Sequence, residues 1–341
     1  MAAHELNEIA RSIVADDKGI LAADESTGTI GKRFDSIGVE STEEHRRAYR
    51  NLLFTTEGFE DFIGGVILFD ETIRQSSDDG TPFGELLAAK GVVPGIKVDT
   101  GAKALAGAPG ETITEGLDGL RERLAEYHTL GARFAKWRAT YSVGDGRPSD
   151  YCVSVNAHAL ARYAALCQEA GIVPIVEPEV LMDTGHSLED SAAATARVLV
   201  RLYEELAAQQ VDLTGTLLKP NMVIPGKGAS DQASPQRIAE ATVSCFRELV
   251  PASVPGIVFL SGGQSELEAT ENLDAVNRVD DRPWPLSFSY GRALQASALA
   301  AWAGSPDNVE AAQQAFLHRA RMNALAAGGG WSSDVEEAVP A

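Results

Sequence analysis

Residues 215–221, which read GTLLKPN, end a short apolar run with a lysine, Lys219. The apolar residues predict a buried strand, which Pro220 ends because proline has no amide donor. A buried ammonium without partners tends to lose its proton, and a neutral lysine is a nucleophile that can form a Schiff base with a carbonyl group. The alternative is an ordinary lysine at a strand end, which reaches solvent or pairs with a carboxylate.

Charged side chains also lie at the ends of other apolar runs. One run ends at Asp24, and three carry charged residues two positions apart, namely Lys97 and Asp99, Lys136 and Arg138, and Glu177 and Glu179. Residues i and i+2 of a strand point to the same face, so each pair presents two charged groups to one side. A single pair is also compatible with a solvated strand end or an internal ion pair. Together, the cations could keep Lys219 neutral while the carboxylates transfer protons.

Eight short apolar runs would bring these residues together. They cover residues 19–24, 64–70, 92–99, 134–138, 172–179, 215–221, 256–262 and 286–292. Apolar residues at three- and four-residue spacing predict helices over residues 5–15, 42–57, 82–90, 115–130, 153–170, 188–210, 235–249, 264–278, 291–303 and 307–326. This alternation predicts an α/β fold, a (β/α)8 TIM barrel with extra N- and C-terminal helices, in which the active site lies at the carboxyl ends of the strands.

The barrel is expected to form a single domain over residues 1–341, with a mobile C-terminal tail over about 327–341. Three glycines at 328–330 end the last predicted helix, and the residues after them are small and acidic. The formal net charge of −20 argues against nucleic acid and anionic membranes as partners. The sequence has neither a signal-peptide pattern nor a membrane-spanning apolar run, so we expect a cytoplasmic protein with reduced cysteines.

Two glycine-containing turns predict a phosphate site. Residues 260–264 (LSGGQ) and 289–292 (SYGR) each place a glycine at the start of a predicted helix, where backbone amides bind anions. The residues expected to bind there are Ser261, Gly262, Ser289, Gly291 and Arg292. Barrels often hold a phosphate at their last two loops, although plain glycine turns are the alternative.

A second basic group predicts another phosphate pocket across the barrel mouth. Lys97 and Arg138 would form it, together with Ser26 and Thr29 from the first loop. Two pockets that face each other indicate a substrate phosphorylated at both ends. A metal site is poorly supported, because no two histidines have HxH or HxxxH spacing, and His186 is a weak candidate as the one histidine near the mouth.

These motifs resemble the class I (Schiff-base) fructose-bisphosphate aldolases from about residue 5 to residue 326. The matching stretches are 18–28 (KGILAADESTG), 64–69 (GGVILF), 95–99 (GIKVD), 134–138 (FAKWR), 176–179 (VEPE), 217–222 (LLKPNM), 260–265 (LSGGQS) and 288–297 (FSYGRALQAS). The resemblance implies a cytoplasmic, homotetrameric lyase of glycolysis and gluconeogenesis without metal or other cofactor. Its phosphosugar substrate would be fructose 1,6-bisphosphate, cleaved reversibly to dihydroxyacetone phosphate and glyceraldehyde 3-phosphate.

The resemblance also implies roles for the charged residues. Lys219 would form the imine with the ketose C2, and the imine would serve as the electron sink. Glu177 would act as acid and base in carbinolamine dehydration, and Asp24 would take the C4 hydroxyl proton. Lys136 and Glu179 would support this network. The C1 phosphate would bind Ser261, Gly262, Gly291 and Arg292, and the C6 phosphate would bind Ser26, Lys97 and Arg138.

The chain departs from the family pattern at two points. Thr29 stands where many members have serine, which keeps the hydroxyl group. Many eukaryotic members end in a tyrosine that folds over the site, whereas the last aromatic residue here is Trp331, so we expect a smaller contribution of the tail to enamine protonation. Two alternatives remain: another Schiff-base barrel of the transaldolase type, and a barrel retained as a binding scaffold.

Overall fold

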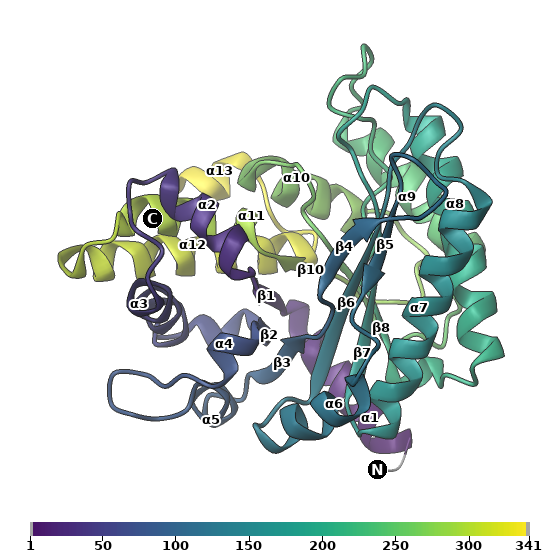
Figure 1. Cartoon of the computed structure of the whole chain (residues 1–341). Helices are drawn as coiled ribbons and strands as arrows, with labels where there is room; N and C mark the ends of the chain where they lie inside the picture. The colour runs from purple at the N-terminus through teal and green to yellow at the C-terminus, as the bar shows by residue number, and fades with distance from the viewer. Residues whose placement is uncertain (1–2, 339–341) are drawn as a thin grey trace.

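The computed structural model describes residues 3–338 and contains a closed barrel of eight parallel strands (Figure 1). The strands are β1 (Gly19–Ala23), β2 (Ile63–Leu68), β3 (Val93–Lys97), β6 (Phe134–Tyr141), β7 (Val173–Val180), β8 (Leu217–Leu218), β9 (Ile257–Phe259) and β10 (Leu286–Tyr290). Their order around the barrel follows the chain, with β10 pairing to β1. Each predicted apolar run overlaps one barrel strand, although β2, β6 and β7 extend beyond their runs, and the predicted (β/α)8 fold is confirmed.

Helices surround the barrel and fill the connections between strands. They are α1 (Ala3–Ile13), α2 (Thr27–Asp35), α3 (Glu43–Phe54), α4 (Asp70–Ile73), α5 (Phe83–Ala89), α6 (Leu120–Thr129), α7 (Asp150–Glu169), α8 (Leu188–Ala208), α9 (Pro235–Leu249), α10 (Glu266–Asn277), α11 (Arg292–Trp302), α12 (Val309–Ala327) and α13 (Ser333–Ala338). All ten predicted helices are present. Ser234 caps α9 and Pro235 begins it, as proline suits the first helical turn.

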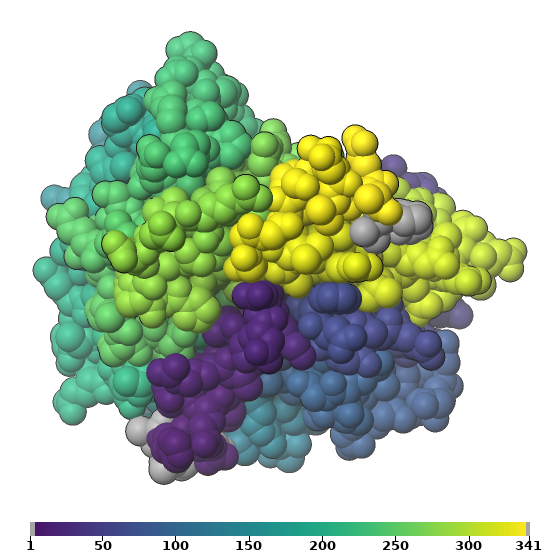
Figure 2. Space-filling view, turned by 180° about the vertical axis from the view of Figure 1, so that it is seen from behind, coloured from purple at the N-terminus to yellow at the C-terminus, as the bar shows by residue number. Residues whose placement is uncertain are grey.

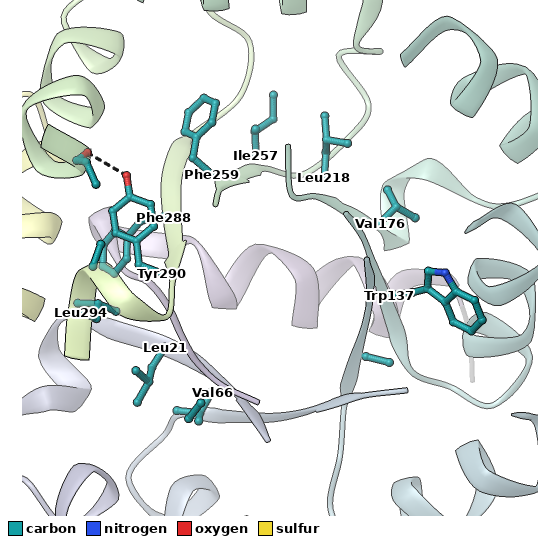
Figure 3. Close-up of a cluster of buried hydrophobic side chains, with 14 of the residues drawn as sticks. Leu21, Val66, Trp137, Val176, Leu218, Ile257, Phe259, Phe288, Tyr290 and Leu294 are labelled. Atoms are coloured by element: carbon teal, nitrogen blue, oxygen red, sulfur yellow. Dashed lines mark hydrogen bonds between the residues drawn. The ribbon is translucent and has the colours of Figure 1, made fainter. Parts of the chain in front are cut away.

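Both faces of the barrel strands are buried. Because successive side chains of a strand point to opposite faces, alternate residues belong to two different hydrophobic cores. Side chains such as Leu21, Val66 and Leu218 point outward and pack with the surrounding helices, as Figure 3 shows. The alternate residues point into the barrel and form a second, smaller cluster with α1. Its strand members are Ile20, Ala22, Ile67, Phe134, Val173, Ile175, Leu217 and Val258. Every second side chain of a strand points to the same face. Each strand therefore has a row of inward-facing side chains that continues to its carboxyl end.

Phe134 fills the amino-terminal half of the barrel, and α1 covers that end. A Cβ on Gly95 would lie 2.3 Å from the Phe134 ring, so the ring can enter only beside a glycine. Leu6, Ala10, Ile13 and Val14 join the inner cluster from α1 and its end, so one stripe of this helix closes the bottom of the barrel. Figure 1 shows α1 at the end of the barrel opposite to β4 and β5.

Two helices and one hairpin near the mouth were not predicted. Residues 27–35 form α2 where we expected a loop, although the glycines at 28 and 31 disfavour a helix; Ser26 occupies the N-cap position. Residues 101–115, between β3 and α6, contain an antiparallel hairpin of β4 (Gly101–Ala104) and β5 (Thr112–Glu115). The short helix α4 follows β2. The predicted helix 115–130 therefore starts later, at Leu120.

The C-terminal segment, which we expected to be mobile from about residue 327, contacts the body of the protein through Trp331 and Glu336. The Trp331 backbone amide donates to Asp274 of α10 (2.9 Å), and the indole Nε1 donates to Glu336 of α13 (2.8 Å). Glu336 also lies 2.7 Å from His318 Nε2 and pairs with Arg319 on α12. Figure 2 shows the yellow C-terminal residues lying on the surface of the molecule. Residues 339–341 of the predicted tail lie outside the described residues.

Candidate active site

All fourteen predicted site residues line one cavity at the carboxyl ends of the strands. It has a volume of about 660 Å³. Seven lysine and arginine side chains and five carboxylates line it, so this cavity is locally basic in a chain with a net charge of −20. A basic site inside an acidic surface favours a small anionic ligand over a large polyanion.

The central charged groups belong to the rows of inward-facing side chains on the strands. On β7, Val173 and Ile175 are followed two residues on by Glu177, and on β8 Leu217 is followed by Lys219. On β6, Phe134 is followed by Lys136 in the same way. Each row is therefore apolar deep in the barrel and charged at the mouth, as the two-residue spacing predicted.

A connected group of four charges lies in the barrel mouth. Lys219 Nζ is 3.0 Å from Glu177 Oε1, and Lys136 Nζ is 3.2 Å from Glu177 Oε2 and 2.8 Å from Asp24 Oδ2. Lys136, Glu177 and Lys219 are each at most 4% exposed. Because buried charges are costly without partners, each ion in this group depends on the opposite charge next to it.

The neighbouring cations keep both carboxylates ionised. Burial alone would raise the pKa of Asp24, but the charges of Lys136 and Lys219 outweigh it and lower this pKa to about 2. The pKa of Glu177 is lowered as well, because Lys136, Lys219 and Arg138 outweigh the effect of its burial. Burial opposes the charge of Lys136, yet Asp24 and Glu177 raise its pKa above the ordinary value. At neutral pH both carboxylates can therefore accept a proton.

The position of Lys219 differs from the sequence-based hypothesis in one respect. We expected neighbouring cations to keep it neutral, but its ion-pair partner within the described residues is the carboxylate of Glu177. Lys136 lies on the other side of that carboxylate. The geometry therefore supplies Lys219 with a proton acceptor in direct contact.

The glycine turns after β9 and β10 form one side of the cavity. Arg292 Nη2 donates to the carbonyl oxygen of Gly262 at 2.9 Å, which joins the two turns. Ser289 Oγ is buried and has no hydrogen-bond partner among the described residues, although Ser289 lines the cavity. A Cβ on Gly291 would lie 3.3 Å from the carbonyl oxygen of Ala22, so glycine allows this turn to approach β1 closely.

The residues of the other predicted phosphate pocket lie on α2, β3 and β6. Ser26 is the N-cap of α2, and its Oγ is 3.1 Å from Thr29 Oγ1. Lys97 Nζ is 2.7 Å from Asp99 Oδ1, and Arg138 pairs with Glu179. Burial opposes the charge of Arg138, but Glu179 raises its pKa above the ordinary value. These hydroxyl and cationic groups can bind an anion, with each cation already balanced by one carboxylate.

A comparison with protein families shows a match to the model described as "Glycolytic: Fructose-bisphosphate aldolase class-I" over residues 5–340. The chain belongs to the class I fructose-bisphosphate aldolase family. A "Probable fructose-bisphosphate aldolase class 1" of Xanthomonas campestris is 56% identical over 332 residues, which are 97% of this chain and 99% of the relative. "Fructose-bisphosphate aldolase 6, cytosolic" of Arabidopsis thaliana is 55% identical over 98% of this chain and 93% of its own length.

A solved structure of the same family has a similar fold. It is the fructose-bisphosphate aldolase of Plasmodium falciparum, in a complex with TRAP and a small-molecule inhibitor. The TM-score is 0.96 and the sequence identity 48%, with 97% of this chain and 96% of that chain covered. Family membership and the barrel fold therefore rest on independent comparisons of sequence and structure.

This aldolase has cavity residues that the sequence analysis missed. Lys32, Arg33 and Ser36 line the cavity from α2 and its C-terminal end. They follow Thr29 by three, four and seven residues, a spacing that places all four on one helix face. The signal was the Ser26 cap followed by this spacing. Glu25 also lines the cavity, and it pairs with both Arg33 and the buried Arg50 of α3.

His186 does not line the aldolase cavity. It is buried in the loop after β7, where its Nδ1 lies 2.8 Å from Thr184 Oγ1, and burial lowers the pKa of its imidazole. The hypothesis that it contributes to the site is wrong. Within residues 3–338, no group of three His, Cys, Asp or Glu side chains is placed to hold a metal ion. In the same part of the chain no helix is long and apolar enough to cross a membrane.

Proposed function

We propose that this chain catalyses the reversible cleavage of fructose 1,6-bisphosphate to dihydroxyacetone phosphate and glyceraldehyde 3-phosphate through an imine on Lys219. The observation that carries the proposal is the contact between Lys219 Nζ and Glu177 Oε1 at 3.0 Å inside a basic cavity. Family membership supports the same reaction. The roles of individual residues given below belong to the proposal.

The first stage is imine formation. Lys219 Nζ gives a proton to Glu177 and attacks C2 of the open-chain ketose, which forms a carbinolamine. Glu177 then returns a proton to the C2 hydroxyl, which leaves as water, and an iminium ion forms. A carboxylate in direct contact with the nucleophile can serve both steps because it alternates between base and acid.

The second stage breaks the bond between C3 and C4. Asp24 accepts the proton of the C4 hydroxyl, the C4 oxygen forms the aldehyde, and the electrons of the C3–C4 bond move into the iminium to give an enamine. Lys136 stabilises the charges of Asp24 and Glu177, because its Nζ lies 2.8 Å and 3.2 Å from their carboxylates. After the aldehyde leaves, protonation at C3 and hydrolysis of the imine release dihydroxyacetone phosphate and restore the lysine.

The two phosphates fit the two polar sides of the cavity. We assign the C1 phosphate to Ser261, Gly262, Ser289, Gly291 and Arg292, and the C6 phosphate to Ser26, Thr29, Lys97 and Arg138. Glu179 holds Arg138 in place. Bidentate arginine contacts and backbone amides at helix starts are common ligands of phosphate groups. Two phosphate sites favour this substrate over a sugar with a single phosphate.

Borohydride trapping tests the proposal directly. The protein is incubated with dihydroxyacetone phosphate and sodium borohydride, and the labelled peptide is identified by mass spectrometry. We expect one modified residue, Lys219, and no labelling in Lys219→Ala. Labelling of another lysine, or cleavage activity that persists in Lys219→Ala, would contradict the assignment.

We also propose that the protein is a cytoplasmic homotetramer. The Arabidopsis relatives are named cytosolic, which supports the location. Large apolar side chains are exposed on neighbouring helices, with Tyr151 of α7 at 50% and Val200 of α8 at 45%, which supports self-association. Light scattering tests the assembly, since a monomer at micromolar concentration would exclude it.

A further inference from the structure

A second cavity adjoins the turn after β9. It has a volume of about 280 Å³ and lies between α9, α10 and the segment 224–235. Met182, Ile224, Pro225, Pro235 and Ile238 give it an apolar surface. We call it the α9–α10 cleft. Its volume is slightly below the about 300 Å³ at which ordinary ligand pockets begin, which suits a small molecule.

The charges of the cleft are all negative. Glu268 and Glu271 of α10 are the only charged side chains among the described residues that line it. Glu268 accepts from the Ser265 amide at 2.8 Å as part of a helix cap, whereas Glu271 makes no ion pair within residues 3–338. Carboxylates beside an apolar surface favour a ligand that combines a positive charge with a hydrocarbon group.

One amide oxygen in the cleft, Asn272 Oδ1, also has no hydrogen-bond partner among the described residues. Gln232 Nε2 donates to the carbonyl oxygens of Gly226 and Ala229, and Asn272 Nδ2 donates to Gln264 Oε1 at 2.7 Å. Asn272 is 6% exposed, and its Oδ1 has no partner among the described residues. Gln232 Nε2 already donates twice, whereas Asn272 Oδ1 still lacks a donor, so a ligand that supplies hydrogen-bond donors complements the cleft.

Gln264 connects the cleft to the predicted C1 phosphate turn. Its backbone amide and its Nε2 both donate to the carbonyl oxygen of Ser261, at 3.0 Å and 3.1 Å. Met182 lines the cleft, and its sulfur accepts from the Gly263 amide at 3.1 Å. A ligand that moves Gln264 or Met182 therefore acts on the turn that carries Ser261 and Gly262.

We propose that the α9–α10 cleft binds a small organic cation, a primary ammonium group on a short branched hydrocarbon, and that this ligand alters phosphate binding at the Ser261–Gly262 turn. The ammonium lies at the Glu268 and Glu271 carboxylates, and the hydrocarbon covers Met182, Ile224 and Ile238. Binding itself is independent of the proposed function. Only its effect on the sugar phosphate rests on that function.

Calorimetric titration with three probes of the same shape tests the binding. The probes are 3-methylbutylamine, 3-methylbutan-1-ol and 3-methylbutanoate, at low ionic strength because salt screens the carboxylates. We expect the amine to bind at least tenfold more tightly than either control. Glu271→Gln should weaken the amine at least threefold and leave the alcohol unchanged, whereas Glu248→Gln on the last turn of α9, outside the cleft, should change neither. Equal affinity for the three probes, or an unchanged affinity in Glu271→Gln, would overturn the site.

The coupling is measured separately with the wild-type protein. At saturating amine we expect the KM for fructose 1,6-bisphosphate to change at least twofold while kcat is maintained. The factor by which the amine changes the dissociation constant of the sugar phosphate should equal the factor by which the bound sugar phosphate changes the amine affinity. An unchanged KM beside measurable amine binding would overturn the coupling. A protein that binds the amine but has no cleavage activity would instead refute the proposed function and leave the cation site supported.

Discussion

Lys136 Nζ lies 2.8 Å from Asp24 Oδ2, although the two residues come from strands that do not pair. Asp24 follows β1, and Lys136 is part of β6, with β2 and β3 between them on the shorter path around the barrel. The ion pair therefore crosses the mouth. Because Glu177 contacts the same ammonium, Lys136 joins the residue assigned to imine chemistry to the residue assigned to bond cleavage.

Replacing Lys136 by methionine should remove this connection. The pKa values of Asp24 and Glu177 should rise, since burial then acts without the cation that lowers them. We expect kcat to fall by about 100-fold, because both carboxylates assigned to proton transfer lose the cation that holds them ionised, and the acid limb of the pH profile of kcat/KM to move to higher pH. Lys90→Met, which removes the peripheral pair with Glu60, is the control and should leave both unchanged.

Asp24 should also make stability depend on pH. Its pKa of about 2 in the folded protein is below the ordinary 3.8, so the unfolded chain binds its proton first as the pH falls. The stabilisation is fully present above about pH 4 and is lost as the pH falls through 2; it amounts to about 2 kcal/mol. The difference in unfolding free energy between wild type and Asp24→Asn should shrink by this amount between pH 4 and 2. A difference independent of pH would show that Asp24 is not held by these cations.

Arg138 should determine recognition of one phosphate only. We expect Arg138→Met to lower kcat/KM for fructose 1,6-bisphosphate by about 10- to 100-fold, the value of one charge-assisted hydrogen bond. The same variant should act on fructose 1-phosphate nearly as well as wild type, because that substrate has no C6 phosphate. Arg292→Met is the matched comparison and should impair both substrates. If Arg138→Met impaired both equally, the assignment of the two phosphate sites would be wrong.

Arg50 should contribute to stability through Glu25. Arg50 and Glu25 are 3% and 8% exposed, and Glu25 also accepts from Gln295 Nε2 at 3.0 Å. Arg50→Met leaves this buried carboxylate with one cation fewer, so we expect a loss of about 3 kcal/mol in urea unfolding. Arg47→Met on the same helix breaks a surface pair with Asp78 and should cost about 1 kcal/mol at most. Similar losses in the two variants would contradict the importance of burial.

The C-terminal segment should matter for stability and little for chemistry. Trp331 is 9% exposed, and residues 331–338 do not line the cavity. Trp331→Ala should therefore lower the unfolding free energy by about 3 kcal/mol while kcat remains within twofold. Deleting residues 331–341 should leave enamine protonation intact, measured by exchange of the C3 hydrogen of dihydroxyacetone phosphate. A collapse of this exchange in a folded deletion variant would refute the prediction.

Much of the site could be predicted because it depends on local periodicity. The two-residue spacing of Lys136 and Arg138, or of Glu177 and Glu179, decides which strand face they share, and the barrel brings such faces together. Contacts between distant segments could not be predicted in this way. The approach of Arg50 on α3 to Glu25 depends on how this helix packs against the segment after β1, and α2 is a helix that its two glycines disfavour.

The helix α1 makes the barrel accessible from one side only. Leu6, Ala10 and Ile13 seal the amino-terminal end, so substrate must enter and both products must depart through the same opening. In the proposed mechanism, the three-carbon ketone fragment stays attached to Lys219 while the aldehyde leaves past the groups assigned to phosphate binding. The proposed covalent attachment therefore sets the order in which the products leave, and the single opening makes both of them use the same path.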